Sequence, residues 1–193
     1  MSIKAQRFTW IDESIIEDEH DRIVSNNREL RDHLELFHQS FECLHQCLRK
    51  HAYSDDTQAL VILRLMARVF NTTGACLKLV RAGYFQPAFT MVRDLLEIEF
   101  LADLFVRDRK HLRRWISVDA KTRKKEFKQI TIRDALDKLD GQTQKKRAKA
   151  YALLSTHATH VDVDGFQMIS PNSMTQIGPF PREDTCGALS RIG

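Results

Sequence analysis

The sequence predicts an all-α protein, an antiparallel bundle of about five helices with a short irregular or hairpin segment near the C-terminus. Apolar residues recur at alternating spacings of three and four over long stretches, which is the helical period. The chain has only 7 Gly and 4 Pro in 193 residues, too few for the many turns of a large sheet. We expect one helical domain over residues 1–193, with residues 1–20 and 182–193 flexible, and leave open a natural chain that continues past Gly193.

The two N-terminal helices are expected to be long. After an acidic lead-in, apolar residues follow the alternating spacing over residues 23–48, with Asn27 at the one polar place, so we predict a single helix with a coiled-coil-like seam. Asp55 or Asp56 suits the N-cap of the second helix, and Gly83 suits its C-terminal end. The long seam also favours a homodimer, because a second copy of the chain could cover it.

The segment Ala82–Val106 is apolar almost all the way round, which is typical of a helix at the centre of a fold. Arg93 and Glu97, four residues apart, interrupt one of its apolar sides. Removing charges from water costs several kcal/mol per ion unless the ions are paired and further hydrogen-bonded. The pair is therefore either an internal staple or the floor of a site, and both residues are catalytic candidates together with His160.

Three further helical stretches are expected in the second half of the chain. Residues 111–127 predict a basic helix, residues 132–139 a turn or two, and residues 144–156 another helix. Beyond them Gly and Pro become frequent. The short runs 166–169 and 174–177 are spaced so that they could pair as a small hairpin.

Polar residues of the last expected helix could meet the charged pair. Tyr151 and Ser155 lie one turn apart on the same helical face, and His160 follows shortly after. If this helix packs on the central one, the candidate ligand-binding cluster consists of Arg93, Glu97, Tyr151, Ser155 and His160. The alternative is a satisfied buried network that fixes the packing of the two helices.

Two groups of residues carry metal-compatible atoms without a metal-binding pattern. Cys43, Cys47 and His51 recur every four residues, and one helical stripe gives poor tetrahedral geometry. The His and Asp residues of segment 157–164 match no zinc spacing and equally suit a turn. We predict no metal and no cofactor.

Charge is distributed unevenly along the chain. Between Arg107 and Lys149 there are 16 Lys and Arg against 6 acidic residues, so the rest of this chain of net charge +4 carries a net charge of −6. A basic half attracts phosphates or an acidic partner surface. The candidate nucleic-acid-binding residues are Arg123, Lys124, Lys125, Lys128, Lys145, Lys146 and Arg147, with a solvated helix surface as the simpler interpretation.

We predict a cytoplasmic protein without a membrane partner. The N-terminus lacks a basic flank followed by an apolar run. We find no stretch that approaches the roughly 20 apolar residues needed to cross a bilayer. The best candidate, residues 82–106, is interrupted by acidic side chains. The four cysteines show no CxxC pair or disulfide-framework spacing and are expected to be reduced thiols.

Five short motifs occur in a recognisable order: Gly83-Tyr-Phe-Gln-Pro-Ala88, Arg93-x3-Glu97, Trp115, Tyr151-x2-Leu-Ser155-x4-His160 and Gly178-Pro-Phe180. In this order they resemble a group of uncharacterised prokaryotic helical proteins, a domain of unknown function. The resemblance implies an all-helical fold and polar motif positions at Arg93, Glu97, Tyr151, Ser155 and His160, without an established activity.

A more distant resemblance, of architecture only, is to HEPN-type bundles, which include toxin ribonucleases of defence systems. Arg28-x4-His33 and Arg31-x6-His38 satisfy the loose Arg-x4-6-His pattern of those enzymes, although both matches lie in the first long helix and no late helix carries one. The leading hypothesis is a module that binds a ligand or an anionic partner. A metal-independent HEPN-like ribonuclease and a nonspecific nucleic-acid-binding protein are the alternatives, so the sequence leaves enzymatic activity open.

Overall fold

The computed structural model describes residues 12–51, 53–158, 164–170 and 177–182. These residues form eight α-helices and one 3-10 helix and contain no strand, which confirms the all-α prediction. The predicted number of about five helices is wrong. In chain order the helices are α1 (Glu13–Asn26), α2 (Arg28–Lys50), α3 (Thr57–Arg81), α4 (Phe85–Arg107), α5 (Arg109–Ser117), α6 (Ala120–Glu126), α7 (Gln129–Leu139), α8 (Lys146–Ala158) and the 3-10 helix η1 (Asp164–Ile169).

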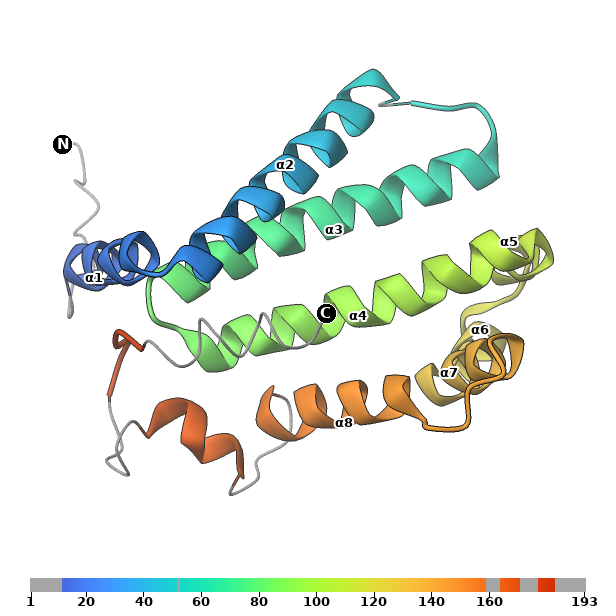
Figure 1. The fold of residues 1–193 in the computed structure, drawn as a ribbon. Coiled ribbons are helices and arrows are strands. Elements are labelled where there is room, and N and C mark those ends of the chain that lie inside the picture. The colour runs from blue at the N-terminus through green and yellow to red at the C-terminus, as the bar shows by residue number, and fades with distance from the viewer. Residues whose placement is uncertain (1–11, 52, 159–163, 171–176, 183–193) are drawn as a thin grey trace, which may run out of the picture.

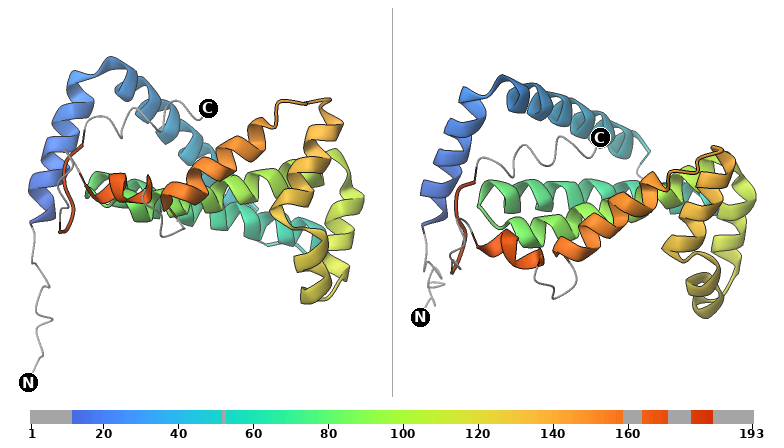
Figure 2. Two further views of the ribbon diagram at one scale, coloured as in Figure 1. Left: turned by 90° about the horizontal axis from the view of Figure 1, so that it is seen from below. Right: turned by 60° about the horizontal axis from the view of Figure 1, so that its bottom comes forward.

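The long helices run antiparallel to one another. Figure 1 shows α2, α3 and α4 in succession, α8 running back along α4, and the short helices α5 to α7 at the far end of α4. Seen from below, α1 and α2 form an arm on one side of the α3–α4 pair (Figure 2). Helix α4 contacts α3, α5, α7, α8 and η1, so it is the central helix that the sequence predicted.

Asn27 divides the predicted first helix into α1 and α2. Its backbone is extended, at φ −117° and ψ 111°, and its side chain accepts a hydrogen bond from the Leu30 backbone N–H at 3.2 Å. Asn is a favourable N-cap because its side-chain oxygen satisfies an N–H that the helix itself leaves unpaired. Asn27, the polar position in the predicted seam, is therefore a helix boundary. The acidic segment before it belongs to a separate helix, α1.

The apolar seam of α2 contacts α3 of the same chain. The rings of Phe41 and Phe70 stack with centroids 4.1 Å apart, and the Phe41 ring also lies against Gly74. The seam therefore gives no separate support for a second copy, and the homodimer stays a prediction.

The helix ends of α3 confirm two predictions. The Asp56 side chain accepts from the Gln58 backbone N–H at 3.0 Å, which caps the N-terminus. Gly83 follows the C-terminal end with a φ of +84°, a left-handed conformation that Gly adopts without steric cost. A Cβ at this position would lie 2.7 Å from the Phe180 carbonyl oxygen, so the close approach of residues 178–182 also requires Gly83.

Two other predictions need correction. The basic stretch 111–127 is two helices rather than one, because the Asp119 side chain accepts from the Thr122 backbone N–H at 2.8 Å and starts α6. Residues 166–169 form part of the 3-10 helix η1 instead of a hairpin strand. The partner strand, residues 174–177, falls almost entirely outside the described residues.

The core lies between α4 and the helices of the second half. One cluster joins Phe89 of α4 with Leu154 of α8 and Met168 of η1. A second cluster follows along α4 toward its C-terminus and is made of Phe100, Leu104, Ile132 and Leu136. Leu96 packs against both clusters, so the polar residues of α4 near this position lie beside the core.

Among the described residues one helix, α3, is long and apolar enough to cross a membrane, although few of its residues are buried. This corrects the expectation that no such stretch exists. Arg64 and Arg68 lie within α3, and Arg68 makes a two-bonded ion pair with Asp94 of α4. Such a contact is typical of packing against a neighbouring helix within a protein.

Candidate functional site: a polar cluster between α4, α7 and α8

Tyr151 is the centre of a polar cluster where α4, α7 and α8 meet. Its hydroxyl accepts from Arg93 Nη2 at 2.6 Å and donates to Glu97 Oε1 at 3.0 Å. Arg93 and Glu97 also pair directly at 3.0 Å. The i, i+4 spacing places both charges on the side of α4 that α8 covers, so the predicted contact with Tyr151 is present.

The charged pair is half-buried. The Arg93 side chain is 24% exposed and the Glu97 side chain 30% exposed, because α8 covers the pair on one side only. Burial lowers the pKa of Arg93, but the Tyr151 hydroxyl and the Glu97 carboxylate raise it, and the net direction is upward. The guanidinium therefore stays charged, and the cluster has a partly open edge.

Arg133 of α7 completes the cluster and is not among the residues predicted from the sequence. Its guanidinium carbon lies 4.1 Å from the centroid of the Tyr151 ring, within the range of a cation–π contact. The residue is only 8% exposed, and its buried Nε and Nη1 have no hydrogen-bond acceptor among the described residues. Asp137, one turn along α7, is bonded to Arg147 at 2.8 Å instead.

Two more buried polar groups lie on the same helices. Ser155 is 8% exposed, and its Oγ has no hydrogen-bond partner in the described part of the chain. Gln129 donates from Nε2 to the Glu97 backbone oxygen at 3.5 Å, and its buried Oε1 likewise has no donor within that part. Buried polar groups are nearly always hydrogen-bonded in native proteins, so these atoms need an explanation.

The structure thus brings together three of the five predicted cluster residues, Arg93, Glu97 and Tyr151, and places Ser155 one turn beyond Tyr151 on α8. His160 lies outside the described residues. Gln129 and Arg133 could have been found from their spacing, since they lie one turn apart and Arg133 directly follows the buried Ile132. The number of basic residues around Arg133 in the sequence hid this signal.

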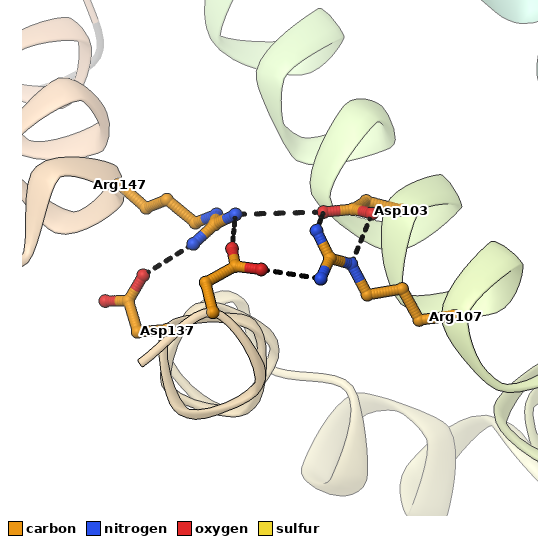
Figure 3. Close-up of polar contacts among 5 residues, drawn as sticks. Asp103, Arg107, Asp137 and Arg147 are labelled. Carbon is orange, nitrogen blue, oxygen red and sulfur yellow. Dashed lines mark hydrogen bonds and ion pairs between the residues drawn. The ribbon is translucent and has the colours of Figure 1, made fainter. Parts of the chain in front are cut away.

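A second charged group lies beside the first at the same three-helix junction. Arg147 of α8 bonds to Asp137 at 2.8 Å and to Asp140 at 2.5 Å, and approaches Asp103 of α4 at 3.8 Å. Arg107 pairs with Asp103 at 2.9 Å and with Asp140 at 2.5 Å (Figure 3). The hydrogen bond from Arg147, and next to it that from Arg107, lowers the pKa of Asp140. This charge network holds α4, α7 and α8 together, because its arginines and aspartates pair with one another.

Two of the seven candidate nucleic-acid-binding residues have internal roles. Arg147 belongs to the charge network, and Arg123 donates to the backbone oxygens of Trp115 and Val118, each at 2.7 Å, while stacking on the Trp115 ring. The other five are exposed: Lys124, Lys125, Lys128, Lys145 and Lys146.

The Arg and His pairs of the HEPN-like pattern lie on the exposed surface of α2. His33 Nδ1 lies 2.8 Å from the Glu29 backbone oxygen, and Arg31 donates to the Ser25 backbone oxygen at 2.7 Å. Within the described residues, no three His, Cys, Asp or Glu side chains form a group that could hold a metal ion, so the Cys43 and Cys47 stripe does not assemble one. Segment 157–164 lies mostly outside those residues.

Comparison of the chain with protein-family models, with curated proteins and with solved structures gave no match.

Proposed function

We propose that this protein is a helical module that binds a small anion at the cluster of Arg93, Glu97, Tyr151, Arg133 and Ser155. The observation that carries the proposal is the buried guanidinium of Arg133, two of whose nitrogens have no acceptor among the described residues. A buried guanidinium whose hydrogen bonds are incomplete costs several kcal/mol, by an order-of-magnitude estimate, and an anion would reduce this cost.

The surroundings of Arg133 support an anion rather than a cation. Two carboxylates of the adjoining helices already have partners, since Glu97 is paired with Arg93 and Asp137 with Arg147. The Tyr151 ring lies against the guanidinium carbon of Arg133, but a ring face supplies no oxygen acceptor for the Nε and Nη1 hydrogens. Planar guanidinium groups bind carboxylate and phosphate oxygens through two parallel hydrogen bonds.

Thermal melting in the presence of anions tests the proposal. At constant ionic strength, acetate or phosphate should raise the Tm of the wild-type protein in a saturable way, because a ligand that binds only the folded state stabilises it. Arg133→Met should melt at the same temperature as wild type or higher without the anion, and should not respond to it. Lys138→Met, which removes an exposed charge from the same helix, should respond as wild type does.

An equal response of wild type and Arg133→Met would overturn the proposal. The HEPN-like ribonuclease is the competing hypothesis. It expects the purified protein to cleave a mixed RNA pool in the presence of a chelator, and it expects His33→Ala, His38→Ala or His160→Ala to abolish the cleavage.

A further inference from the structure

We propose that residues 183–193 of this chain pack into an apolar cavity between the arm of α1 and α2 and the pair of α3 and α4. We call this site the arm cavity. None of its wall residues belongs to the polar cluster around Tyr151, so the inference does not depend on anion binding.

The arm cavity is large and mostly apolar. Its volume of about 500 Å³ lies within the range of about 300–1,000 Å³ that binding pockets occupy. It lies between the arm and the α3–α4 pair (Figure 2), and its walls include Val24, Leu34, Phe37, Leu77 and Leu95. The only buried residues of the described helices α2 and α3 are Leu30 and Cys76, so the apolar faces of both helices are incompletely covered. An exposed apolar surface of this kind marks an interaction site.

The last described residue, Arg182, lies at the wall of the arm cavity. Phe180 is 4% exposed, and its ring contacts that of Phe85 with centroids 5.4 Å apart. Two residues later, the Arg182 backbone N–H donates to His20 Nε2 at 3.2 Å. His20 is itself a wall residue of the cavity. The packed segment 178–182 therefore delivers residue 183 to the edge of the cavity.

The sequence of residues 183–193 suits an apolar surface. Its members at i, i+3, i+4 and i+7 fall on one face of a helix, and they are Thr185, Ala188, Leu189 and Ile192. The charged residues fall on the opposite face, and they are Glu183, Asp184 and Arg191. The segment is thus amphipathic at the helical period, with its apolar face available for the cavity.

The length of the segment also matches the cavity. As a helix, residues 183–193 would extend over about 16 Å, and the α2 wall of the cavity from Leu30 to His38 extends over about 12 Å. A helix this short, with Gly187 in its middle, is marginal in water by itself. Contact with the cavity supplies the apolar burial that the segment needs.

The covalent connection favours this segment over a separate molecule. A short connection gives the attached segment an effective concentration on the order of millimolar at the cavity. A second copy of the chain or an apolar ligand must reach a comparable concentration to displace it. The occupant we infer is therefore the chain's own segment.

Cross-linking from Cys186 tests the location of the segment directly. In a chain with Cys43→Ser, Cys47→Ser and Cys76→Ala, the added substitution Leu34→Cys places one thiol on the cavity wall. A short bis-maleimide should then join positions 34 and 186 within one chain, which mass spectrometry of the peptides detects. Leu139→Cys in the same background is the control and should form no such link, because Leu139 is 59% exposed at the end of α7 and is not a wall residue.

Protection from alkylation tests whether the apolar face of the segment holds it in place. The thiol of Leu34→Cys should react at least about tenfold faster when Leu189→Ser and Ile192→Ser are added, because the two apolar anchors are lost. Ser190→Ala with Arg191→Gln changes the opposite face and should leave the rate as it is. The thiol of Leu139→Cys should react at one rate in all of these chains.

Three outcomes would overturn the inference. The first is a failure of positions 34 and 186 to link while the control position behaves as expected. The second is a link between different chains, seen as mixed peptide pairs when isotope-labelled and unlabelled proteins are combined, since a second copy would then occupy the cavity. The third is protection of position 34 that survives Leu189→Ser with Ile192→Ser, since something other than the segment would then cover the wall.

Discussion

Tyr151 links both charges of α4 through one oxygen atom. Its hydroxyl accepts from Arg93 and donates to Glu97, and its ring supports Arg133. A phenol uses both its donor and its acceptor capacity here, which fixes the position of the hydrogen and orients the two charged groups. The residue therefore positions the cluster without carrying charge.

Tyr151→Phe should lower the free energy of unfolding by about 1–3 kcal/mol, because it removes two hydrogen bonds to charged groups and keeps the ring. Urea denaturation measures the change. Tyr53→Phe is the matched control, because Tyr53 is 75% exposed and should change stability by less than about 0.5 kcal/mol. Equal effects of the two substitutions would show that the hydroxyl of Tyr151 does not stabilise the cluster.

Cys76 should be the least reactive thiol of the described residues. Burial raises its pKa from 9.0 to about 11, so almost no thiolate is present at pH 8, whereas Cys43 is exposed. Since the thiolate is the reactive form, we expect Cys43 to be alkylated much faster than Cys76. Peptide mapping by mass spectrometry after brief alkylation measures both rates, and comparable rates would contradict the assignment.

The same raised pKa gives a pH dependence with a definite sign. Between pH 9 and about 11 the unfolded chain loses the Cys76 proton while the folded chain keeps it. Stability therefore falls as pH rises through this interval, because the folded state binds more protons. Cys76→Ala should lack this part of the slope.

At the scale of elements, the helices are separated by side chains and turns that cap them. Asn27 and Asp119 each interrupt a stretch that is helical by periodicity, and each does so by accepting a hydrogen bond from a backbone N–H of the following helix. Capping competes locally with continuing the helix, and the polar cap is favoured where the chain must turn.

Gly83 shows how a turn is required by packing as well as by conformation. Gly83→Ala should lower the free energy of unfolding by clearly more than Gly141→Ala. Both positions have positive φ, at +84° and +64°, and share the left-handed cost of about 1–2 kcal/mol. Only at Gly83 would the new Cβ collide with the backbone of Phe180.

Differential scanning calorimetry of the two variants measures this difference. A larger loss for Gly83→Ala would confirm that the segment 178–182 is held against the α3–α4 turn. His20, which is buried, contacts both sides of this junction, since its two ring nitrogens lie 2.7 Å from the Arg81 oxygen and 3.2 Å from the Arg182 nitrogen. Equal losses of unfolding free energy in the two variants would mean that residues 178–182 can move away from position 83 without destabilising the fold.

At the scale of the whole molecule, the second half of the chain is basic, but many of its arginines bond to groups of the protein itself. Arg107, Arg114, Arg123 and Arg147 bond to carboxylates or backbone oxygens. The exposed lysines of α6 and of the α7–α8 connection, together with Lys128 between α6 and α7, are available for an external polyanion.

If the protein binds RNA, the affinity should fall steeply with added salt, because binding releases the counterions of the RNA. Lys124→Gln with Lys125→Gln should reduce the slope of log affinity against log salt concentration by about 0.7 per residue on single strands. Lys78→Gln is the control, because Lys78 is exposed on α3 and lies outside the basic half of the chain. Binding with no salt dependence would contradict an electrostatic interface.

The homodimer stays a prediction, and sedimentation can measure the oligomeric state that tests it.

The sequence by itself determined the helical class, the central position of the helix with Arg93 and Glu97, and the ends of α3, at Gly83 and at one of the two residues Asp55 and Asp56. These features depend on local physics, namely the period of apolar residues, capping chemistry and the conformational freedom of Gly. For the same reason the approach of Tyr151 to the charged pair could be predicted, since it needed only two helix faces and one packing contact.

Only the tertiary structure decided which charges are satisfied. Arg133 and Arg147 are alike in the sequence, yet one lies on an aromatic ring without an acceptor among the described residues and the other is bonded to Asp137 and Asp140. Pairing depends on which groups from distant segments lie within about 3 Å of each other. Burial makes this pairing matter more, because the free-energy cost of an unpaired charge rises steeply away from water. Periodicity along one chain carries no information about such distances.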